Sequence, residues 1–140
     1  MGKEVQLTLI GLQRDEEGQE NITRLSVRAE YYLKNGSHYI LYEEKQPDGG
    51  LTKNTIKFKD NLLELTKRGA VNSRMVFERG REHMTDYATP FGLLRLGVLA
   101  QEIVFCQSGN FLEIQARYSL AQAGQPFSHC KITINIQDLV

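Results

Sequence analysis

Apolar side chains recur at every second position through most of this 140-residue chain. The alternation is clearest in segments 25–33, 112–120 and 130–136, where polar residues occupy most of the positions in between. Successive side chains of a strand point to opposite faces of the sheet, so this alternation is typical of a strand with one buried face. No segment keeps the 3.6-residue spacing of a helix as regularly. The sequence therefore predicts an all-β protein.

Short turn sequences separate the alternating segments. They are Asn35-Gly36, Pro47-Asp48-Gly49-Gly50, Asp60-Asn61, Gly69-Ala70, Gly109-Asn110 and Gly124-Gln125-Pro126. Connections this short make sequence neighbours into spatial neighbours. Segment 93–108 is more apolar and could form a helix. We favour a long strand there, with a bend or bulge at Gly97.

About ten strands in a meander would leave two exposed edges unless the sheet closed on itself. We therefore predict one domain over residues 1–140, an up-and-down β-barrel of about 8–10 strands. Its first and last strands should pair and bury Leu7, Ile114 and Ile134 together. A barrel near eight strands is either filled by side chains or holds one small ligand.

Charge and composition argue against several function classes. Lys+Arg and Asp+Glu both number 17, which makes nucleic acid an unlikely partner. No run approaches 18 apolar residues and the N-terminal segment alternates, so we expect a cytoplasmic protein without a membrane partner. Cys106 and Cys130 lack metal-ligand spacing and are interpreted as buried, reduced thiols; a disulfide or a metal site is the alternative. We expect no metal and no cofactor.

One predicted strand carries a row of polar side chains on a single face. This polar row consists of Arg81, His83, Thr85, Tyr87 and Thr89. If it faces inward, it makes a polar wall among aliphatic ones, as a small-ligand pocket requires. Arg79 precedes the row and could bind a carboxylate or phosphate through two hydrogen bonds. The candidate ligand-binding residues are thus Arg79, His83, Thr85, Tyr87 and Thr89.

Two other interpretations of the row remain open. In the first, Met84 and Ala88 face the core and the row is the solvated face of the strand. In the second, Tyr87 and Thr89 hold the following corner by hydrogen bonds to backbone.

That corner, Pro90-Phe91-Gly92, combines a fixed φ with a residue that tolerates positive φ, as a barrel rim requires. We expect Phe91 to cap one end of the barrel. As an alternative, Phe91 anchors a protein partner, which could be a second copy in a homodimer.

The segment from Thr85 to Gly92, T-x-Y-x-T-P-F-G, also carries a family resemblance, strengthened by the upstream turn 69–72, G-A-V-N. Over essentially its whole length the chain resembles a family of small bacterial proteins with a calycin-like β-barrel, typified by the Bacillus protein YwiB. The resemblance implies a lipocalin-like meander barrel. It supplies no catalytic residue, ligand or reaction.

Three functions are compatible with these features. The first is the binding of a small anionic or amphipathic ligand inside the barrel. The alternative is a solid barrel that serves protein interaction or homo-oligomerisation without a ligand. The third is an enzyme that uses His83 as a general acid or base with Tyr87. The sequence has no nucleophile elbow, phosphate-binding loop or dinucleotide fingerprint, so we assign no catalytic residue.

Overall fold

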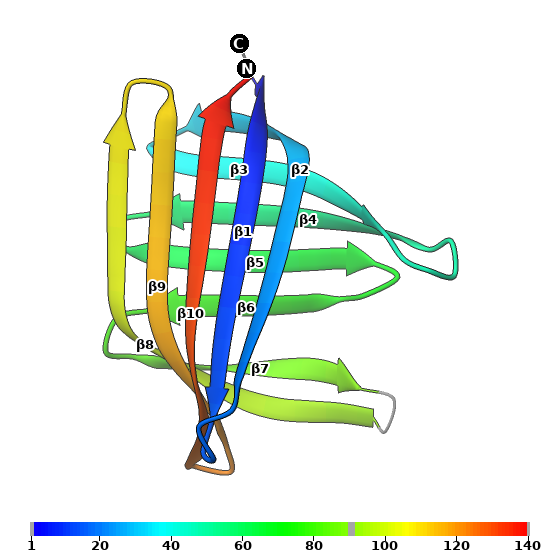
Figure 1. Ribbon diagram of the computed structural model, residues 1–140, viewed down its shortest axis with the longest axis vertical. Coiled ribbons are helices and arrows are strands. Elements are labelled where there is room, and N and C mark those ends of the chain that lie inside the picture. The colour runs from blue at the N-terminus through cyan, green and yellow to red at the C-terminus, as the bar shows by residue number, and fades with distance from the viewer. Residues whose placement is uncertain (1, 90–91, 140) are drawn as a thin grey trace.

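A computed structural model describes residues 2–89 and 92–139, which fold into ten strands joined by short turns (Figure 1). No helix occurs in these ranges, and the all-β prediction is confirmed. The strands are β1 (Lys3–Asp15), β2 (Glu20–Lys34), β3 (Ser37–Lys45), β4 (Leu51–Lys59), β5 (Leu62–Gly69), β6 (Ser73–Glu78), β7 (Glu82–Thr89), β8 (Gly92–Ser108), β9 (Phe111–Gln122) and β10 (Gln125–Asp138).

Sequence neighbours pair antiparallel throughout the sheet, except that β6 and β7 form its two ends. The predicted pairing of first and last strands is confirmed, with a register from Val5↔Asp138 to Asp15↔Ser128. This pairing brings the two chain ends side by side, as Figure 1 shows. The result is an up-and-down barrel that is nearly closed.

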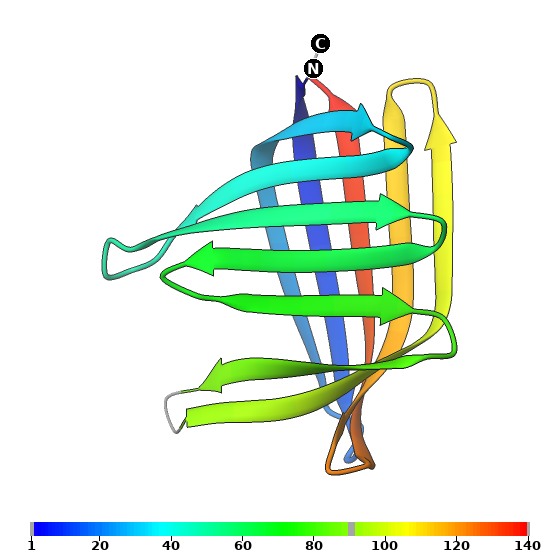
Figure 2. The ribbon, with the colours of Figure 1, turned by 180° about the vertical axis from the view of Figure 1, so that it is seen from behind.

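The barrel is flattened into two crossing layers (Figures 1 and 2). One layer contains β1, β9 and β10, and the other contains β3 to β7. Two long strands belong to both layers. Strand β2 pairs with β1 over residues 20–31 and with β3 over 30–34, while β8 pairs with β7 over 92–99 and with β9 over 97–108. Such strands form the corners of orthogonally packed sheets.

The irregularity predicted at Gly97 lies instead around Gln101. The register of β8 on β9 shifts between Ala100 and Glu102, whereas Gly97 pairs regularly on both sides. A bulge is needed where β8 leaves the β7 ladder, because the extra residue bends the strand toward the other layer. A Cβ at Gly97 would meet the carboxylate end of the exposed Glu82 side chain, so a larger residue there requires that side chain to move.

The space between the layers is filled mainly by apolar side chains from both. Leu7, Ile114 and Ile134 have no exposed surface, so their predicted common burial is confirmed. The two cysteines are free, as predicted, but only one of them is buried. Cys130 lies inside, whereas Cys106 is exposed because the bulge leaves Phe105 as the inward-facing neighbour.

Candidate functional site

The middle of the polar row, His83 and Thr85 of β7, faces the inside of the barrel. Residues directly opposite each other in an antiparallel pair share a face, and His83 and Thr85 lie opposite Val98 and Leu96. Both of these β8 residues are buried. The interpretation in which the row is the solvated face is therefore wrong for the middle of the strand, and exposed Met84 lies on the outer face.

Two side chains of the row join β7 to β6, where a backbone ladder is missing. The Thr85 hydroxyl donates to the backbone carbonyl of Arg74 at 2.6 Å, and Thr85 is only 7% exposed. His83 Nε2 lies 2.8 Å from a Glu78 carboxylate oxygen. Backbone pairing at this seam is limited to an isolated bridge between Glu78 and Arg81. These contacts complete the closure of the barrel.

Tyr87 continues the row toward the opposite layer. It is 49% exposed and lies near Tyr118 of β9, which stands opposite Cys130 of β10 in the strand register. Burial raises the pKa of Tyr118, and the neighbouring Cys130 and Tyr87 raise it further. Burial also raises the pKa of the Cys130 thiol. Both groups are therefore uncharged near neutral pH.

The remaining predicted site residues are not gathered with the row. Arg79 is exposed in the β6–β7 turn and forms a bridge with Ala100, and Arg81 is also exposed. The side chain of Thr89 and the whole of Phe91 lie outside the described residues.

A second group of inward-facing polar residues was missed by the sequence interpretation. This inner polar patch consists of Glu44, Thr52, Asn54 and Lys67. The pairs Glu44↔Thr52 and Asn54↔Lys67 hold it in register across β3, β4 and β5. Period-two counting from the core residues Ile40 and Ile56 would have found it, since Glu44 and Thr52 lie an even number of positions away.

The inner polar patch is internally bonded. Thr52 and Asn54 are 0% and 4% exposed, while Glu44 Oε1 and Lys67 Nζ form a 2.8 Å ion pair at the open end of the layer. Gln46 donates to the Thr52 hydroxyl at 3.1 Å. Burial raises the pKa of neighbouring Tyr42, and the negative charge of Glu44 raises it further. The interior is thus aliphatic in its middle and polar toward the β3–β4 turn.

Comparison with known proteins places the chain in a family. Residues 7–134 match the profile of the domain of unknown function DUF1934. The chain belongs to the DUF1934 family. A search of curated proteins found no match.

A solved structure similar to this DUF1934 domain is the crystal structure of the YwiB protein from Bacillus subtilis. The TM-score is 0.85, with 19% sequence identity over 99% of this chain and 94% of that chain. At this identity the likeness shows the fold alone, and it agrees with the predicted family and barrel.

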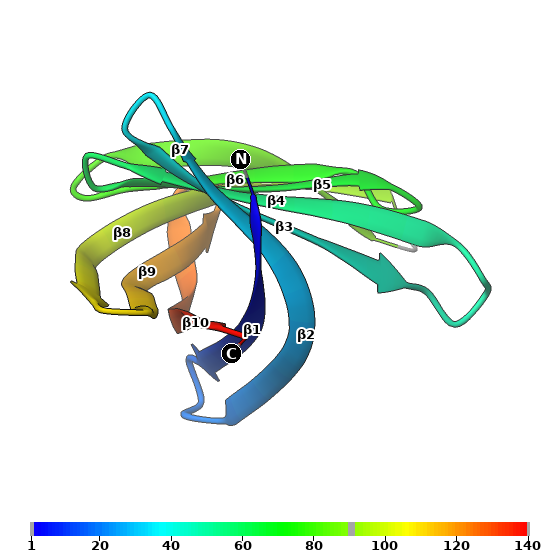
Figure 3. The same ribbon diagram turned by 90° about the horizontal axis from the view of Figure 1, so that it is seen from above.

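The DUF1934 domain leaves one strand edge without a partner. The β2–β3 register ends at the pair Glu30↔Leu41, and within the described chain residues 20–29 of β2 pair on the β1 side only. Beyond this point β2 curves away beneath the β3–β4 hairpin, as Figure 3 shows. The open corner, defined by this free edge and the overhanging end of β3 to β5, is bordered by the inner polar patch.

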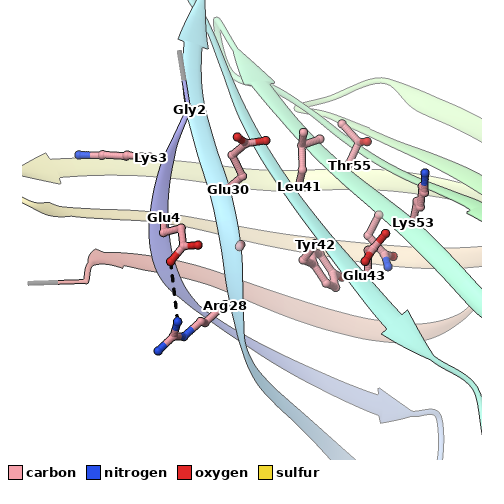
Figure 4. A pocket seen from close by; sticks show the side chains of 12 residues that line it. Gly2, Lys3, Glu4, Arg28, Glu30, Leu41, Tyr42, Glu43, Lys53 and Thr55 are labelled. Atoms are coloured by element: carbon pink, nitrogen blue, oxygen red, sulfur yellow. Dashed lines mark ion pairs between the residues drawn. The ribbon is translucent and has the colours of Figure 1, made fainter.

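At the same divergence lies a cleft of about 680 Å³ (Figure 4). Outward-facing side chains of β2, β3 and β4 line it, among them Glu30, Leu41, Glu43, Lys53 and Thr55, and the buried residues Ala29, Tyr42 and Asn54 also border it. We call it the outer cleft.

Across 2–89 and 92–139 no three His, Cys, Asp or Glu side chains converge as metal ligands would. The same ranges contain no helix long and apolar enough to cross a membrane.

Proposed function

We propose that this protein is a non-catalytic interaction module that accepts an extended segment of a partner protein as an additional strand on β2. The observation that carries the proposal is the free edge at residues 20–29. Alternate residues of such an edge present backbone N–H and C=O groups that an added strand can pair with. Main-chain hydrogen bonds then supply affinity, and side-chain contacts supply specificity.

The packed interior supports this proposal over a ligand held centrally. Large side chains from both layers meet between the sheets, including Phe77, Leu63 and Ile40, each at most 1% exposed. A strand added to β2 would instead occupy the open corner. Its inward side chains would face the inner polar patch, so a segment with polar or charged residues on that face fits best.

Charged side chains along the free edge, including Glu20, Arg24 and Arg28, are all exposed. Charges on an edge strand disfavour indiscriminate pairing between copies. They therefore favour a partner whose own charges match this pattern.

The test uses random peptides displayed on phage and selected on the intact protein. Thr23 is exposed and lies on the inner face of β2, opposite Gly11. Thr23→Lys places an inward charge at the open corner and should reduce binding of the selected peptides by tenfold or more. Thr8→Lys, on the outer face of central β1, is the matched control and should leave binding unchanged.

Amide hydrogen exchange locates the bound strand. Binding should slow exchange in residues 20–29 of β2. Protection confined to another region, or equal peptide binding by the Thr23→Lys variant, would refute the proposal. If sedimentation of the protein alone shows a dimer that Thr23→Lys dissociates, the occupant of the edge is a second copy.

A small anionic ligand bound by Arg79, His83, Thr85, Tyr87 and Thr89 is the second candidate, and the inward orientation of His83 and Thr85 favours it. Native mass spectrometry of the protein as purified from its host should then reveal a bound small molecule. Arg79→Ala and His83→Ala should each reduce its occupancy. Retention of the ligand by both variants would exclude this assignment.

A further inference from the structure

The outer cleft presents three different side chains in one straight line across three strands. Glu30 of β2 lies opposite Leu41 of β3, and Leu41 lies opposite Thr55 of β4. All three project from the same face, as Figure 4 shows. A carboxylate, an apolar surface and a hydroxyl therefore follow one another across the cleft.

The charges around this line are only partly neutralised within the protein. Arg28 pairs with Glu4 at 3.8 Å, and Lys3 pairs with Asp138 at 2.8 Å. Among the described residues, Glu30 and Lys53 belong to no ion pair within 4 Å.

Glu43 lies directly opposite Lys53 across β3 and β4, also without an ion pair of its own in the described chain. Its carboxylate keeps the potential near Lys53 from becoming strongly positive. An extended anion such as nucleic acid is therefore disfavoured there, while a single carboxylate can still reach the ammonium group.

Glu30 and Lys53, which form no ion pair among the described residues, lie at two sides of the cleft. Glu30 and Lys53 are two strands apart, about 10 Å, and two residues apart along the strand, about 7 Å. Their Cα atoms are therefore separated by about 12 Å, and both side chains project from the same face of their strands, as Figure 4 shows. An extended chain of three residues spans at most about 10–11 Å, and an ion pair of about 3 Å at each end brings the span between the two charged groups to about 16 Å. The long Glu30 and Lys53 side chains reach this span by leaning outward by about 2 Å each.

We propose that the outer cleft binds short peptides, of about three residues, by both of their free ends. The α-ammonium group of the peptide pairs with Glu30 and its α-carboxylate pairs with Lys53. The peptide backbone lies over Leu41, and the Thr55 hydroxyl donates to or accepts from it. The cleft volume, about 680 Å³, lies within the range of small-ligand sites. This site borders the free edge at Arg28 and Ala29, but the four side chains that contact the peptide, from Glu30, Leu41, Lys53 and Thr55, lie beyond residues 20–29.

The experiment is a titration of the isotope-labelled protein with trialanine, N-acetyl-trialanine and trialanine amide, followed by amide chemical shifts. Trialanine should shift resonances in residues 28–30, 41–43 and 53–55. Capping either end should weaken binding about tenfold, which corresponds to about 1.4 kcal/mol.

Two variants assign the two ends. Glu30→Gln should bind trialanine and its N-acetyl form equally well while still discriminating against the amide. Lys53→Met should bind trialanine and its amide equally well while still discriminating against the N-acetyl form. Both positions are exposed, so both variants should fold, and circular dichroism checks this. Glu16→Gln, in the exposed β1–β2 turn, is the control and should bind as the unaltered protein does.

Equal binding of the three peptides, or shifts that avoid the cleft at saturation, would overturn the proposal. The Thr23→Lys variant separates this site from the proposed edge. This variant should bind trialanine as the unaltered protein does. Failure of strand addition would therefore leave the peptide result unaffected, and failure of peptide binding would leave strand addition untouched.

Discussion

Most buried polar side chains that the structure describes are hydrogen-bonded. No buried side-chain nitrogen or oxygen of the described residues lacks a hydrogen bond. Thr85 uses a backbone carbonyl of β6, and the Tyr31 hydroxyl lies 2.7 Å from His38 Nδ1. An unpaired polar group inside the barrel would cost more than the bond itself contributes. This cost explains why polar residues occur inside a barrel whose middle is aliphatic.

His38 is the residue at which we expect pH to affect stability. Its ring lies 5.1 Å from the Phe105 ring, and burial lowers the pKa of His38 below its usual 6.5. The unfolded chain therefore takes up a proton more readily than the folded one. Neutral His38 therefore makes its full contribution to the free energy of unfolding above about pH 6.5. The free energy of unfolding should fall as pH drops below that value.

Urea unfolding at a series of pH values measures this dependence. His38→Gln should flatten the curve between pH 7 and pH 5. The same change at His129, an exposed residue of β10, should leave the curve as it is. An unchanged slope in His38→Gln would assign the acid sensitivity to other groups.

At the scale of elements, the seam between β6 and β7 differs from every other neighbouring pair. Nine strand pairs form ladders in the described chain, whereas this pair relies on side chains and an isolated bridge. A slot of about 330 Å³ lies along the seam, lined by Arg74, Val76 and residues 83–86. The seam is therefore the place where we expect the barrel to open most readily.

Thr85→Val keeps the shape of the side chain and removes its hydroxyl. The Arg74 carbonyl would lose its donor, so the free energy of unfolding should fall by about 1–3 kcal/mol. Amides of β6 and β7 should exchange faster, and hydrogen exchange checks this.

Thr8→Val, on the outer face of β1, is the matched control because no side-chain hydrogen bond of Thr8 occurs within the described residues. It should leave exchange at the seam unchanged. Equal exchange at the seam in Thr85→Val and the unaltered protein would show that the hydroxyl does not hold β6 and β7 together.

At the scale of the whole molecule, the barrel depends on pairing between the two ends of the chain. The β1–β10 ladder joins segments more than a hundred residues apart, and Lys3 forms an ion pair with Asp138 at 2.8 Å. Contacts this distant in sequence make folding slow compared with helical proteins. They also place the termini next to each other.

A circular permutant should therefore fold. Joining the termini with a short flexible linker and opening the chain in the exposed turn at residues 16–19 keeps every ladder intact. The far-ultraviolet circular dichroism should match that of the original protein, with a similar unfolding midpoint. A permutant opened at residue 114, inside β9, serves as the control and should not fold. Failure of the turn permutant would show that the ends are not adjacent.

The sequence by itself determined the strands, the turns and the pairing order. Alternation is a local property, and turn residues such as Asn35 and Gly36 have the positive φ angles, 53° and 77°, that their side chains predict. The inward burial of Ile114 and Ile134 followed from the same counting. The family resemblance agreed with this result without adding a site.

Tertiary structure alone decided where the sheet bends and which polar residues meet. The bulge falls at Gln101 because β8 leaves β7 there, and no local signal marks that position. Likewise, Thr85 donates across a seam that exists only because the two ends of the sheet face each other. The free edge of β2 arises because β2 pairs with β3 over a few residues and then follows β1. Strand register and partner exchange depend on contacts between distant segments, and alternation within one segment carries no information about them.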